Sequence, residues 1–275
     1  YNVVNDNEIK VSDAEIIDYI TKKRNVYKQD GGRYISYVSF SANPSANDTI
    51  KAKESIESLK TTFIADTNAN IFLARNMSTI KYFDGYSLKS KMAMIQKDTI
   101  AALPTGNVYG PYLDGGSYVL AKMLGNRQMP DSVRARTILV STRDLQTGQP
   151  TIADSVAKKR IDSISTAIKG GADFNIMVLQ YSDDMVSKEK GGAYDFSSIQ
   201  FQNLPKEFSE VVFYGTSGDK KTVKTDIGWY YIEVISQKNF ETAYKVAYMS
   251  KQILATDETV NNASMKATKL SGENR

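Results

Sequence analysis

Two short apolar segments with the alternation of β-strands enclose a helical segment between Arg134 and Gln237. The first strand reads RARTILVST and the second reads KTDIGWYYIEVIS. The helix is predicted to begin at a capping box on Thr151 and to end at Gly170-Gly171, because glycine accepts a left-handed backbone. Its inward face is expected to carry Ile152, Val156, Ile161, Ile164 and Ile168. The rest of the chain is organised around this segment, since the same order of parts occurs before it and begins again after it.

The region before this segment is expected to fold from the same parts. Alternation from Arg33 to Phe40 predicts a strand, and Asn43-Pro44 would end it. Asn47 or Asp48 can cap a following helix. The remaining expectations are inward residues at Ile50, Ile56, Leu59 and Phe63, a short helix over 70–75, and a strand pair at 110–112 and 117–121.

Three short matches relate the two regions. Thr49-Ile50 matches Thr151-Ile152, Asn70-Ile71 matches Asn175-Ile176, and Gly116-Ser117-Tyr118 matches Gly228-Trp229-Tyr230. The offset between matched residues grows along the chain. This growth predicts one duplicated unit whose second copy has a longer middle loop.

The pattern begins a third time after Asn239. Tyr244, Val246 and Tyr248 would form one face of a strand, and Asp257 can cap a helix. That helix would carry Val260, Ala263, Ala267 and Leu270 on one side. We interpret this tail as a truncated repeat or as an element that packs on the rest of the chain.

The N-terminal residues are expected to form a helix or linker that leads into the first region. Ser12 and Glu15 have capping-box spacing, and Gly31-Gly32 would end this part. The sequence begins at Tyr1 without an initiator methionine or a signal-like apolar stretch, which favours a processed or excised segment of a longer protein.

Composition places the chain among soluble globular proteins. It has 275 residues, of which 41% are hydrophobic and 24% charged, and that length suffices for two domains. Lys and Arg exceed Asp and Glu by 35 to 31 with the two signs interspersed, which disfavours nucleic acid as a partner. No apolar run approaches the roughly 18 residues of a membrane span, so membrane contact is expected only through a segment outside this chain.

The absence of two residue types excludes several kinds of site. The chain contains neither histidine nor cysteine. A zinc site of the usual kind, a Ser-His or Cys-His nucleophile and an imidazole proton shuttle are therefore impossible. We expect no metal and no cofactor. Absence of cysteine is also compatible with an extracytoplasmic protein.

The order of motifs between Arg134 and Gln237 resembles the parvulin family of peptidyl-prolyl isomerases. The family strand that usually reads ARHILV is here ARTILV, and the family turn YSD(C/D) is Tyr181 to Asp184. Gly191-Gly192 matches the glycines that follow. The family wall MVPEF is here NLPKEF, which ends at Phe208. The closing TxxGxHII is here TDIGWYYI, which begins at Thr225.

The resemblance implies where a site would lie. Thr137 and Tyr230 occupy the places of the two family histidines, and Asp184 occupies the acidic or thiol position. These three residues could form an O–H···O network in place of the histidine network. Leu204, Phe208 and Thr225 would then bind the substrate, with Phe201 or Phe213 as further candidates for the apolar shelf.

Each of these residues also has a purely structural interpretation. Thr137 can be a plain strand residue, because threonine is common in strands. Asp183 and Asp184 can form turns or helix caps, and Phe208 and Tyr230 can be ordinary packing residues. The first region departs further from the family pattern, because it lacks the acidic turn and has Tyr118 at the second histidine position. We expect no isomerase activity from it.

The resemblance implies an α+β fold with two tandem parvulin-like domains, each with an antiparallel sheet of about four strands wrapped by helices. The expected division is 1–32 as an N-terminal helix or linker, 33–126 as a degenerate parvulin-like domain, 132–238 as a parvulin-like isomerase domain and 239–275 as the tail.

Tandem modules of this kind look like the extracytoplasmic folding factors of the SurA, PpiD and PrsA type. This likeness implies binding of unfolded or partly folded polypeptides and their proline-containing segments, in the periplasm or elsewhere outside the cytoplasm. Two hypotheses follow. One is a prolyl isomerase with weak turnover that assists exported proteins, and the other is a non-catalytic polypeptide-binding module.

Overall fold

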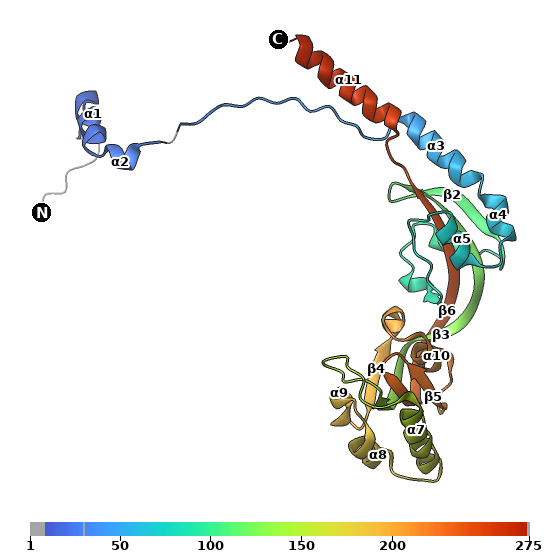
Figure 1. Cartoon of the computed structure of the whole chain (residues 1–275). Coiled ribbons are helices and arrows are strands. Elements are labelled where there is room, and N and C mark those ends of the chain that lie inside the picture. Colours follow the sequence, from blue (N-terminus) through green and yellow to red (C-terminus); the bar gives the residue numbers. More distant parts are fainter. Residues whose placement is uncertain (1–8, 30, 274–275) are drawn as a thin grey trace, which may run out of the picture. The chain divides into compact units, whose positions relative to one another are not determined.

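The computed structural model describes residues 9–29 and 31–273, and the chain separates into two compact units (Figure 1). One unit consists of Tyr1–Ser41 with Asn261–Arg275, and the other of Ala42–Val260. Among the described residues, no helix combines the length and apolar character needed to cross a membrane.

The N-terminal helix begins at the predicted capping box but ends before the predicted Gly31-Gly32. Helix α1 (Asp13–Lys22) begins after Ser12, whose side chain accepts a hydrogen bond from the Glu15 amide while Glu15 bonds back to the Ser12 amide. A short helix α2 (Arg24–Tyr27) follows. The predicted division 1–32 starts outside the described residues, which begin at Ile9.

The strand predicted from Arg33 to Phe40 is wrong for this structure. These residues belong to no strand, and Tyr34, Ile35, Tyr37 and Val38 are largely exposed. Alternation predicts how a segment would pair, but a strand also needs a neighbour to receive its backbone hydrogen bonds.

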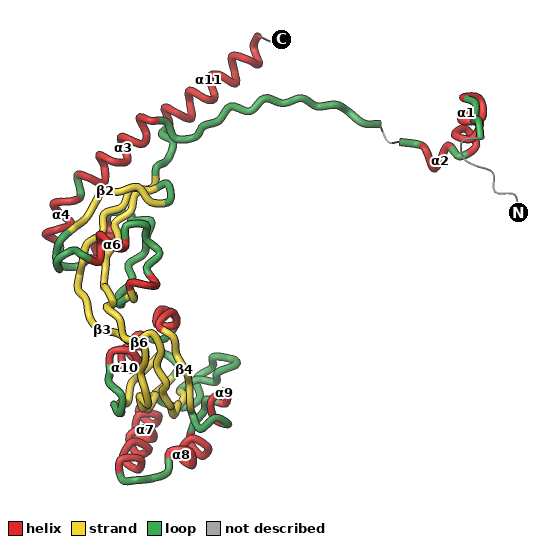
Figure 2. The backbone as a smooth tube through the Cα atoms, turned by 180° about the vertical axis from the view of Figure 1, so that it is seen from behind, coloured by secondary structure: helices red, strands yellow, loops and turns green. Residues whose placement is uncertain are grey.

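The larger unit is built on two long antiparallel strands, β3 (Ser117–Ser141) and β6 (Gly228–Gln252), which pair along almost their whole length. They run through two groups of smaller elements (Figure 2). The spatial order is β1-β6-β3-β2 in one half, while in the other half β4 pairs with β3 and β5 pairs with β6. The predicted α+β class with an antiparallel sheet is therefore confirmed.

One half of the larger unit is formed by residues 134–237, the predicted isomerase region. We call it the parvulin half. Its outer strands are β4 (Ala193–Ser197) and β5 (Lys220–Thr225). One face of its sheet packs on α10 (Lys206–Tyr214), with Phe208, Val212 and Ile232 buried between them. The opposite face packs on α7 (Asp154–Lys169) and α8 (Phe174–Tyr181). Two short elements, α9 (Met185–Lys188) and the 3-10 helix η3 (Ser198–Asn203), complete it.

The other half has the same two-faced arrangement. The helices α3 (Ala46–Glu57), α4 (Lys60–Ala65) and α5 (Ala69–Arg75) cover one face, where Ile56, Phe63 and Leu120 are buried. The opposite face carries α6 (Lys97–Ala101) over Val119, Ala121 and Val246. Its outer strands are β2 (Val108–Asp114) and the very short β1 (Ser87–Leu88), which the 3-10 helix η2 (Lys89–Lys91) follows.

Two of the predicted domain boundaries fall inside continuous strands. β3 crosses the predicted boundary at 126–132 without a break, and β6 crosses the boundary at 238–239. The first part of the predicted tail is therefore the end of β6, which pairs with residues 117–130. Both halves share the same two strands, so no linker separates them.

Several predicted helix starts are displaced by a few residues. Ser45 caps α3 in place of Asn47 or Asp48, and α7 starts after Ala153 without the capping box expected at Thr151. Ile50 and Val156, both expected to face inward, are exposed. The helices over 69–75 and 257–273 (α11, Asp257–Glu273) agree with the sequence.

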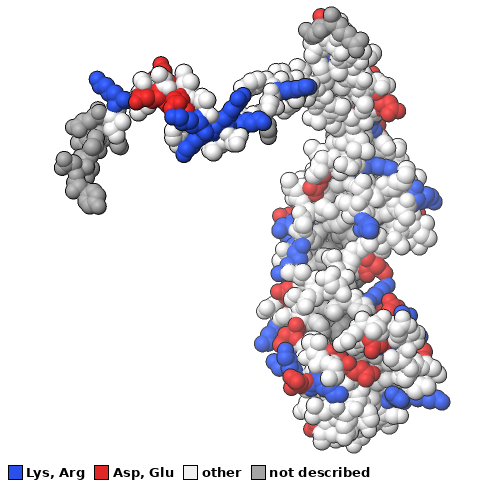
Figure 3. All heavy atoms as spheres, turned by 60° about the vertical axis from the view of Figure 1, so that its left-hand side comes forward, with Lys and Arg blue, Asp and Glu red and all other residues white. Residues whose placement is uncertain are grey.

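Charges of both signs are interspersed over the face shown in Figure 3, as the small excess of Lys and Arg implies.

Candidate functional site

The predicted site residues lie around the face of the sheet that α10 covers. Thr137 is in β3 and Tyr230 in β6, where Thr137 pairs with Ile232 and Leu139 with Tyr230. Directly paired residues of antiparallel strands share a face, so Thr137 and Tyr230 are diagonal neighbours on it. Sequence order alone did not give this register.

Asp184 is the centre of the polar contacts at this site. Its carboxylate caps α9 by accepting the Val186 amide. The hydroxyls of Ser187 and Tyr194 both donate to Asp184 Oδ2 at 2.6 Å. The carboxylate is thus held by three donors while its residue remains half-buried. The structural role proposed for Asp184, a helix cap, and its place in the site coexist.

Tyr194 is a site residue that the sequence analysis missed. It lies in β4, opposite Ala135 of β3, and its ring stacks on Phe196 at 5.4 Å. The alternation of Tyr194 and Phe196 after Gly191-Gly192 is a strand signal with one aromatic face. That signal could have identified Tyr194 as a neighbour of the site.

The network expected between Thr137, Asp184 and Tyr230 is not the one observed. Thr137 is fully buried, and its Oγ1 has no hydrogen-bond partner among the described residues. Its backbone amide donates to Gly192 O at 2.8 Å instead. Asp184 receives its phenolic hydrogen bond from Tyr194, so the tyrosine of β4 fills the role that we expected of Tyr230.

Tyr230 belongs to an aromatic series that runs across the face. Its ring meets Phe208 edge to face with centroids 5.0 Å apart, and Phe208 meets Phe196 at 5.6 Å. Such edge-to-face contacts are favourable for aromatic rings. Phe201 and Phe213 form a separate contact at 5.6 Å within the same core and do not touch this series through their rings.

Leu204 and Thr225 lie at the border of the aromatic series. Leu204 is half-buried just before Pro205, which precedes α10, and packs against the same core. Thr225 is buried, and its hydroxyl donates to Gly228 O across the β5–β6 turn at 3.0 Å. A cavity of about 360 Å³ adjoins it, lined by Glu207, Val223, Lys224, Thr225 and Asp226.

Burial governs the electrostatics of the two tyrosines. Removal from water raises the pKa of Tyr194 to about 12, and its hydrogen bond to the Asp184 carboxylate adds to this effect. Burial also raises the pKa of Tyr230, with smaller contributions from Asp184 and Tyr194. Both phenols therefore stay protonated near neutral pH and can only donate a hydrogen bond or accept through a neutral oxygen.

Another cavity lies on the opposite face of the sheet. It has a volume of about 660 Å³ between α7 and α8, where Lys159, Arg160, Met177 and Asp183 contribute to its wall. Of the two neighbouring aspartates in the sequence, Asp183 thus faces this cavity and also accepts the Ser141 amide. None of the six predicted site residues lines it.

A comparison with protein families identifies the segment. Residues 118–238 match the family described as the PPIC-type PPIase domain. This segment is a parvulin domain. The match covers β3 from Tyr118 onward, β6 as far as Lys238 and all the elements between them, including Asp184, Tyr194 and Phe208.

Curated relatives of this parvulin domain include two proteins named Chaperone SurA. The one from Pseudomonas savastanoi pv. phaseolicola is 28% identical over 149 residues, which are 52% of this chain and 33% of that protein. The one from Legionella pneumophila (strain Lens) is 30% identical over 154 residues, which are 53% of this chain and 34% of that protein. The chain thus spans about a third of the length of these relatives.

Solved structures that are similar to parts of this chain include the peptidylprolyl isomerase PrsA from Bacillus anthracis. It has 25% identity and a TM-score of 0.32, over 41% of this chain and 44% of that chain. A SurA-like chaperone structure from Campylobacter jejuni has 17% identity and a TM-score of 0.30, over 98% of this chain and 84% of that chain.

Proposed function

We propose that the chain is a peptidyl-prolyl cis-trans isomerase and chaperone that assists the folding of exported proteins. The single observation that carries the proposal is the parvulin domain at residues 118–238. One face of its sheet carries the aromatic series and the hydrogen-bonded carboxylate of Asp184. The relatives named Chaperone SurA support the same role. The proposed partners are unfolded or partly folded polypeptides with proline-containing segments, and the proposed location is the periplasm or another extracytoplasmic space.

The proposed chemistry needs no nucleophile. Rotation about a peptide bond crosses a barrier of roughly 18–20 kcal/mol that comes from C–N resonance. The two isomers of an X–Pro bond differ by only about 0.5–1 kcal/mol, so a catalyst need only bind the twisted amide more tightly than the planar one. We assign the pyrrolidine shelf to Phe208 and Leu204. Apolar surroundings disfavour the charge-separated resonance form and so favour the twisted amide.

The polar side of the proposed site is held by Asp184, with Tyr194 as its positioning residue and Thr137 and Tyr230 at the places of the family histidines. Neither Thr137 Oγ1 nor Tyr230 forms a hydrogen bond to Asp184 in the contacts described above. We expect turnover to be slower than that of parvulins with both histidines, because the site lacks the donors that an imidazole pair supplies.

A proline-limited refolding assay tests this function. The chain should accelerate the slow phase of a protein whose refolding waits for an X–Pro isomerisation. Phe208→Leu should remove most of this acceleration, because it removes the aromatic edge against Tyr230. Phe213→Leu is the matched control, since Phe213 lies in the same helix and is equally buried but contacts Phe201.

The outcomes separate the isomerase from the binding module. Acceleration that Phe208→Leu abolishes and Phe213→Leu preserves supports the isomerase. If the chain suppresses aggregation of an unfolded client without any acceleration, the catalytic proposal is wrong and only the chaperone part stands.

A further inference from the structure

The segment 34–41 has the features of a strand without a place in the sheet. Tyr34, Ile35, Tyr37 and Val38 are between 68% and 108% exposed, although large apolar side chains with period-two alternation are typical of a half-buried strand. This segment leads directly to the loop before α3. Its expected position is therefore next to the strands that α3 covers.

That position is already occupied. In the parvulin half, the first strand consists of residues 134–141 of β3. It precedes the helices of that half and lies beside β6. In the other half, helices α3 to α5 follow residues 34–41, but the corresponding place beside β3 is taken by residues 244–252 of β6. The order β1-β6-β3-β2 of this half matches the order β4-β3-β6-β5 of the parvulin half. In this match, the end of β6 occupies the place that the first strand has in the parvulin half.

The occupant has the same pattern as the exposed segment. Without a gap, ISYVS at 35–39 aligns with VAYMS at 246–250. The alignment places Ser36 on Ala247 and Val38 on Met249, both of which are fully buried in the sheet. A small residue, Ser36, and a medium-sized apolar residue, Val38, therefore fall on two buried positions.

The same alignment equates the residues that precede two helices. It places Ser45, the cap of α3, on Thr256, the residue just before α11. Residues 42–44 and 253–255 then connect each helix to its strand segment. Both connections have equal length, and each can span roughly 10 Å.

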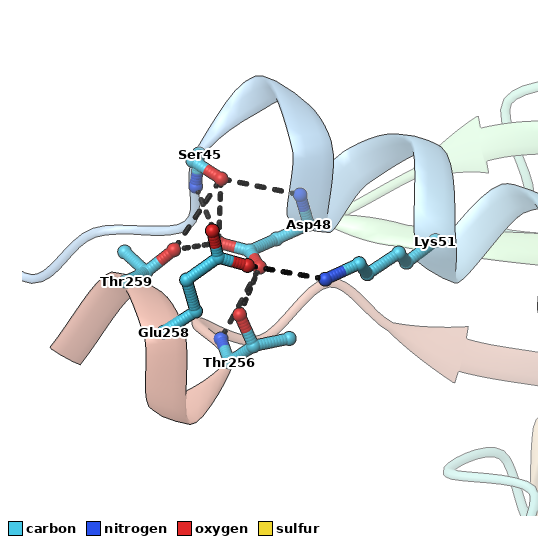
Figure 4. A network of polar contacts seen from close by, with 6 residues as sticks. All are labelled: Ser45, Asp48, Lys51, Thr256, Glu258 and Thr259. Carbon is cyan, nitrogen blue, oxygen red and sulfur yellow. Dashed lines mark hydrogen bonds and ion pairs between the residues drawn. The ribbon is translucent and has the colours of Figure 1, made fainter. Parts of the chain in front are cut away.

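The two helices begin at one carboxylate, Asp48 (Figure 4). Asp48 is buried and accepts hydrogen bonds from the amide and hydroxyl of Ser45, both at 2.8 Å. It also accepts the hydroxyls of Thr256 and Thr259, both at 2.6 Å. The negative carboxylate suits the positive ends of both helices. The connections to 34–41 and to 245–252 therefore start from the same point.

We propose that residues 34–41 and 245–252 are alternative occupants of one position in the sheet, beside residues 117–126 of β3. The N-terminal segment of the same chain can replace the end of β6 there. Both states make equivalent backbone ladders and fill the same faces, so the free-energy difference between them is small compared with the cost of leaving the position empty. In the observed state residues 34–40 lie outside the sheet, and in the exchanged state residues 245–252 leave it together with the start of α11.

Disulfide trapping tests the exchange, because the chain has no native cysteine. Ser250 lies opposite Val119 in the sheet, and its amide and carbonyl bond to residues 78 and 79 on the other side. The pair is thus of the non-hydrogen-bonded type, whose Cα atoms lie about 4.5 Å apart and within disulfide range. Ser250→Cys with Val119→Cys is the reference pair for the observed state.

The alignment places Ser39 where Ser250 lies, so Ser39→Cys with Val119→Cys reports the exchanged state. This pair should crosslink within one chain under oxidised glutathione. Val38→Cys with Val119→Cys is the register control and should crosslink roughly tenfold more slowly, because adjacent strand residues face opposite sides. Met249→Asp should accelerate the Ser39 crosslink roughly tenfold or more, since a buried charge expels residues 245–252.

Three results would overturn the proposal. One is the absence of the Ser39 crosslink both with and without Met249→Asp, while the Ser250 reference pair forms and circular dichroism shows a folded chain. Another is equal crosslinking of the Val38 control, which would indicate random collision. The third is a Ser39 crosslink that joins two chains on a non-reducing gel, which would make a second copy the occupant.

Discussion

Asp184 shows how one side chain can cap a helix and also belong to a site. Its carboxylate is held by the Val186 amide and by the hydroxyls of Ser187 and Tyr194. The phenol of Tyr194 connects β4 to this cap, so the strand and α9 are fixed relative to each other. The position of Asp184 beside the aromatic series therefore depends on Tyr194 as well as on the turn that precedes α9.

Tyr194→Phe removes only this phenolic hydrogen bond. We expect the free energy of unfolding to fall by about 1–2 kcal/mol, because the bond is partly buried and its acceptor is charged. We also expect the refolding acceleration to fall, since Asp184 loses its orientation. Urea unfolding and the proline-limited assay measure the two effects. Tyr181→Phe, at an exposed tyrosine of α8, should change neither quantity.

Lys122 is a buried cation whose role is structural. Its Nζ donates to three backbone carbonyls at the end of α4, those of Phe63, Ile64 and Asp66, at 2.7–2.9 Å. Burial lowers the pKa of this lysine, and the nearby Asp66 opposes that shift. A positive charge is favourable at the C-terminal end of a helix, so Lys122 joins α4 to β3.

Lys122→Met leaves those three carbonyls without their donor. We expect a loss of about 2–3 kcal/mol in the free energy of unfolding, which urea titration measures. Lys53→Met on the exposed surface of α3 is the control and should stay within about 0.5 kcal/mol of the parent chain. Equal losses in the two variants would contradict the assigned role.

At the scale of single residues, the sequence predicted positions better than contacts. The motif order located Asp184, Phe208 and Tyr230 in one domain, and Phe208 and Tyr230 do touch. It could not predict that Thr137 Oγ1 would lack a partner, because this depends on strand register and side-chain direction. Tyr194 was missed because no motif marks a residue whose role comes from its neighbours.

Among the elements, the contact between β4 and β3 depends on a glycine. Gly192 has φ +76°, and a Cβ at this position would lie 2.4 Å from the Thr137 carbonyl oxygen. The turn before β4 therefore needs both a left-handed backbone and a close approach to β3. Gly148 has a similar φ of +71° but open space around it.

These two glycines form a matched pair for substitution. Gly148→Ala should cost roughly 1 kcal/mol from backbone strain alone. Gly192→Ala should cost roughly 1–3 kcal/mol more, because β4 must also move away from Thr137. Thermal unfolding of both variants measures the difference. Equal losses would mean that the close approach contributes nothing to stability.

The element boundaries were the weakest part of the sequence prediction. The start of α1 after Ser12 and the end of α7 before Gly170 agree with the sequence signals, whereas α1 ends at Lys22 and not at Gly31-Gly32. The two long strands were predicted as separate short ones, because the alternation of each half suggests its own strand. Only pairing over the full length shows that β3 and β6 are shared, and local periodicity carries no information about that pairing.

At the scale of the whole larger unit, Asp84 links segments that are far apart in the sequence. Its carboxylate accepts Lys206 Nζ of α10 at 2.5 Å and also forms an ion pair with Lys245 of β6. Hydrogen bonds from these two lysines lower the pKa of Asp84 from its ordinary value of 3.8 to about 2. The carboxylate thus connects the parvulin half, through α10, to the C-terminal part of β6.

This pKa shift gives the unit a specific acid dependence. Because the folded-state pKa of Asp84 is lowered, its contribution to stability is complete well above pH 3.8 and is lost progressively as the pH falls through about 2. Asp84→Asn should therefore lower the free energy of unfolding at about pH 5, by about 1 kcal/mol after allowance for solvent screening.

The difference between Asp84→Asn and the parent chain should shrink as the pH falls through about 2 and approach zero below it, where Asp84 becomes protonated in the folded and the unfolded state. Urea unfolding of both proteins from about pH 5 downward measures this difference in the free energy of unfolding. The other carboxylates are common to both proteins, so their titration cancels in the difference. A difference that stays constant with pH would mean that the amide disturbs packing and that the ion pairs with Lys206 and Lys245 contribute no stability.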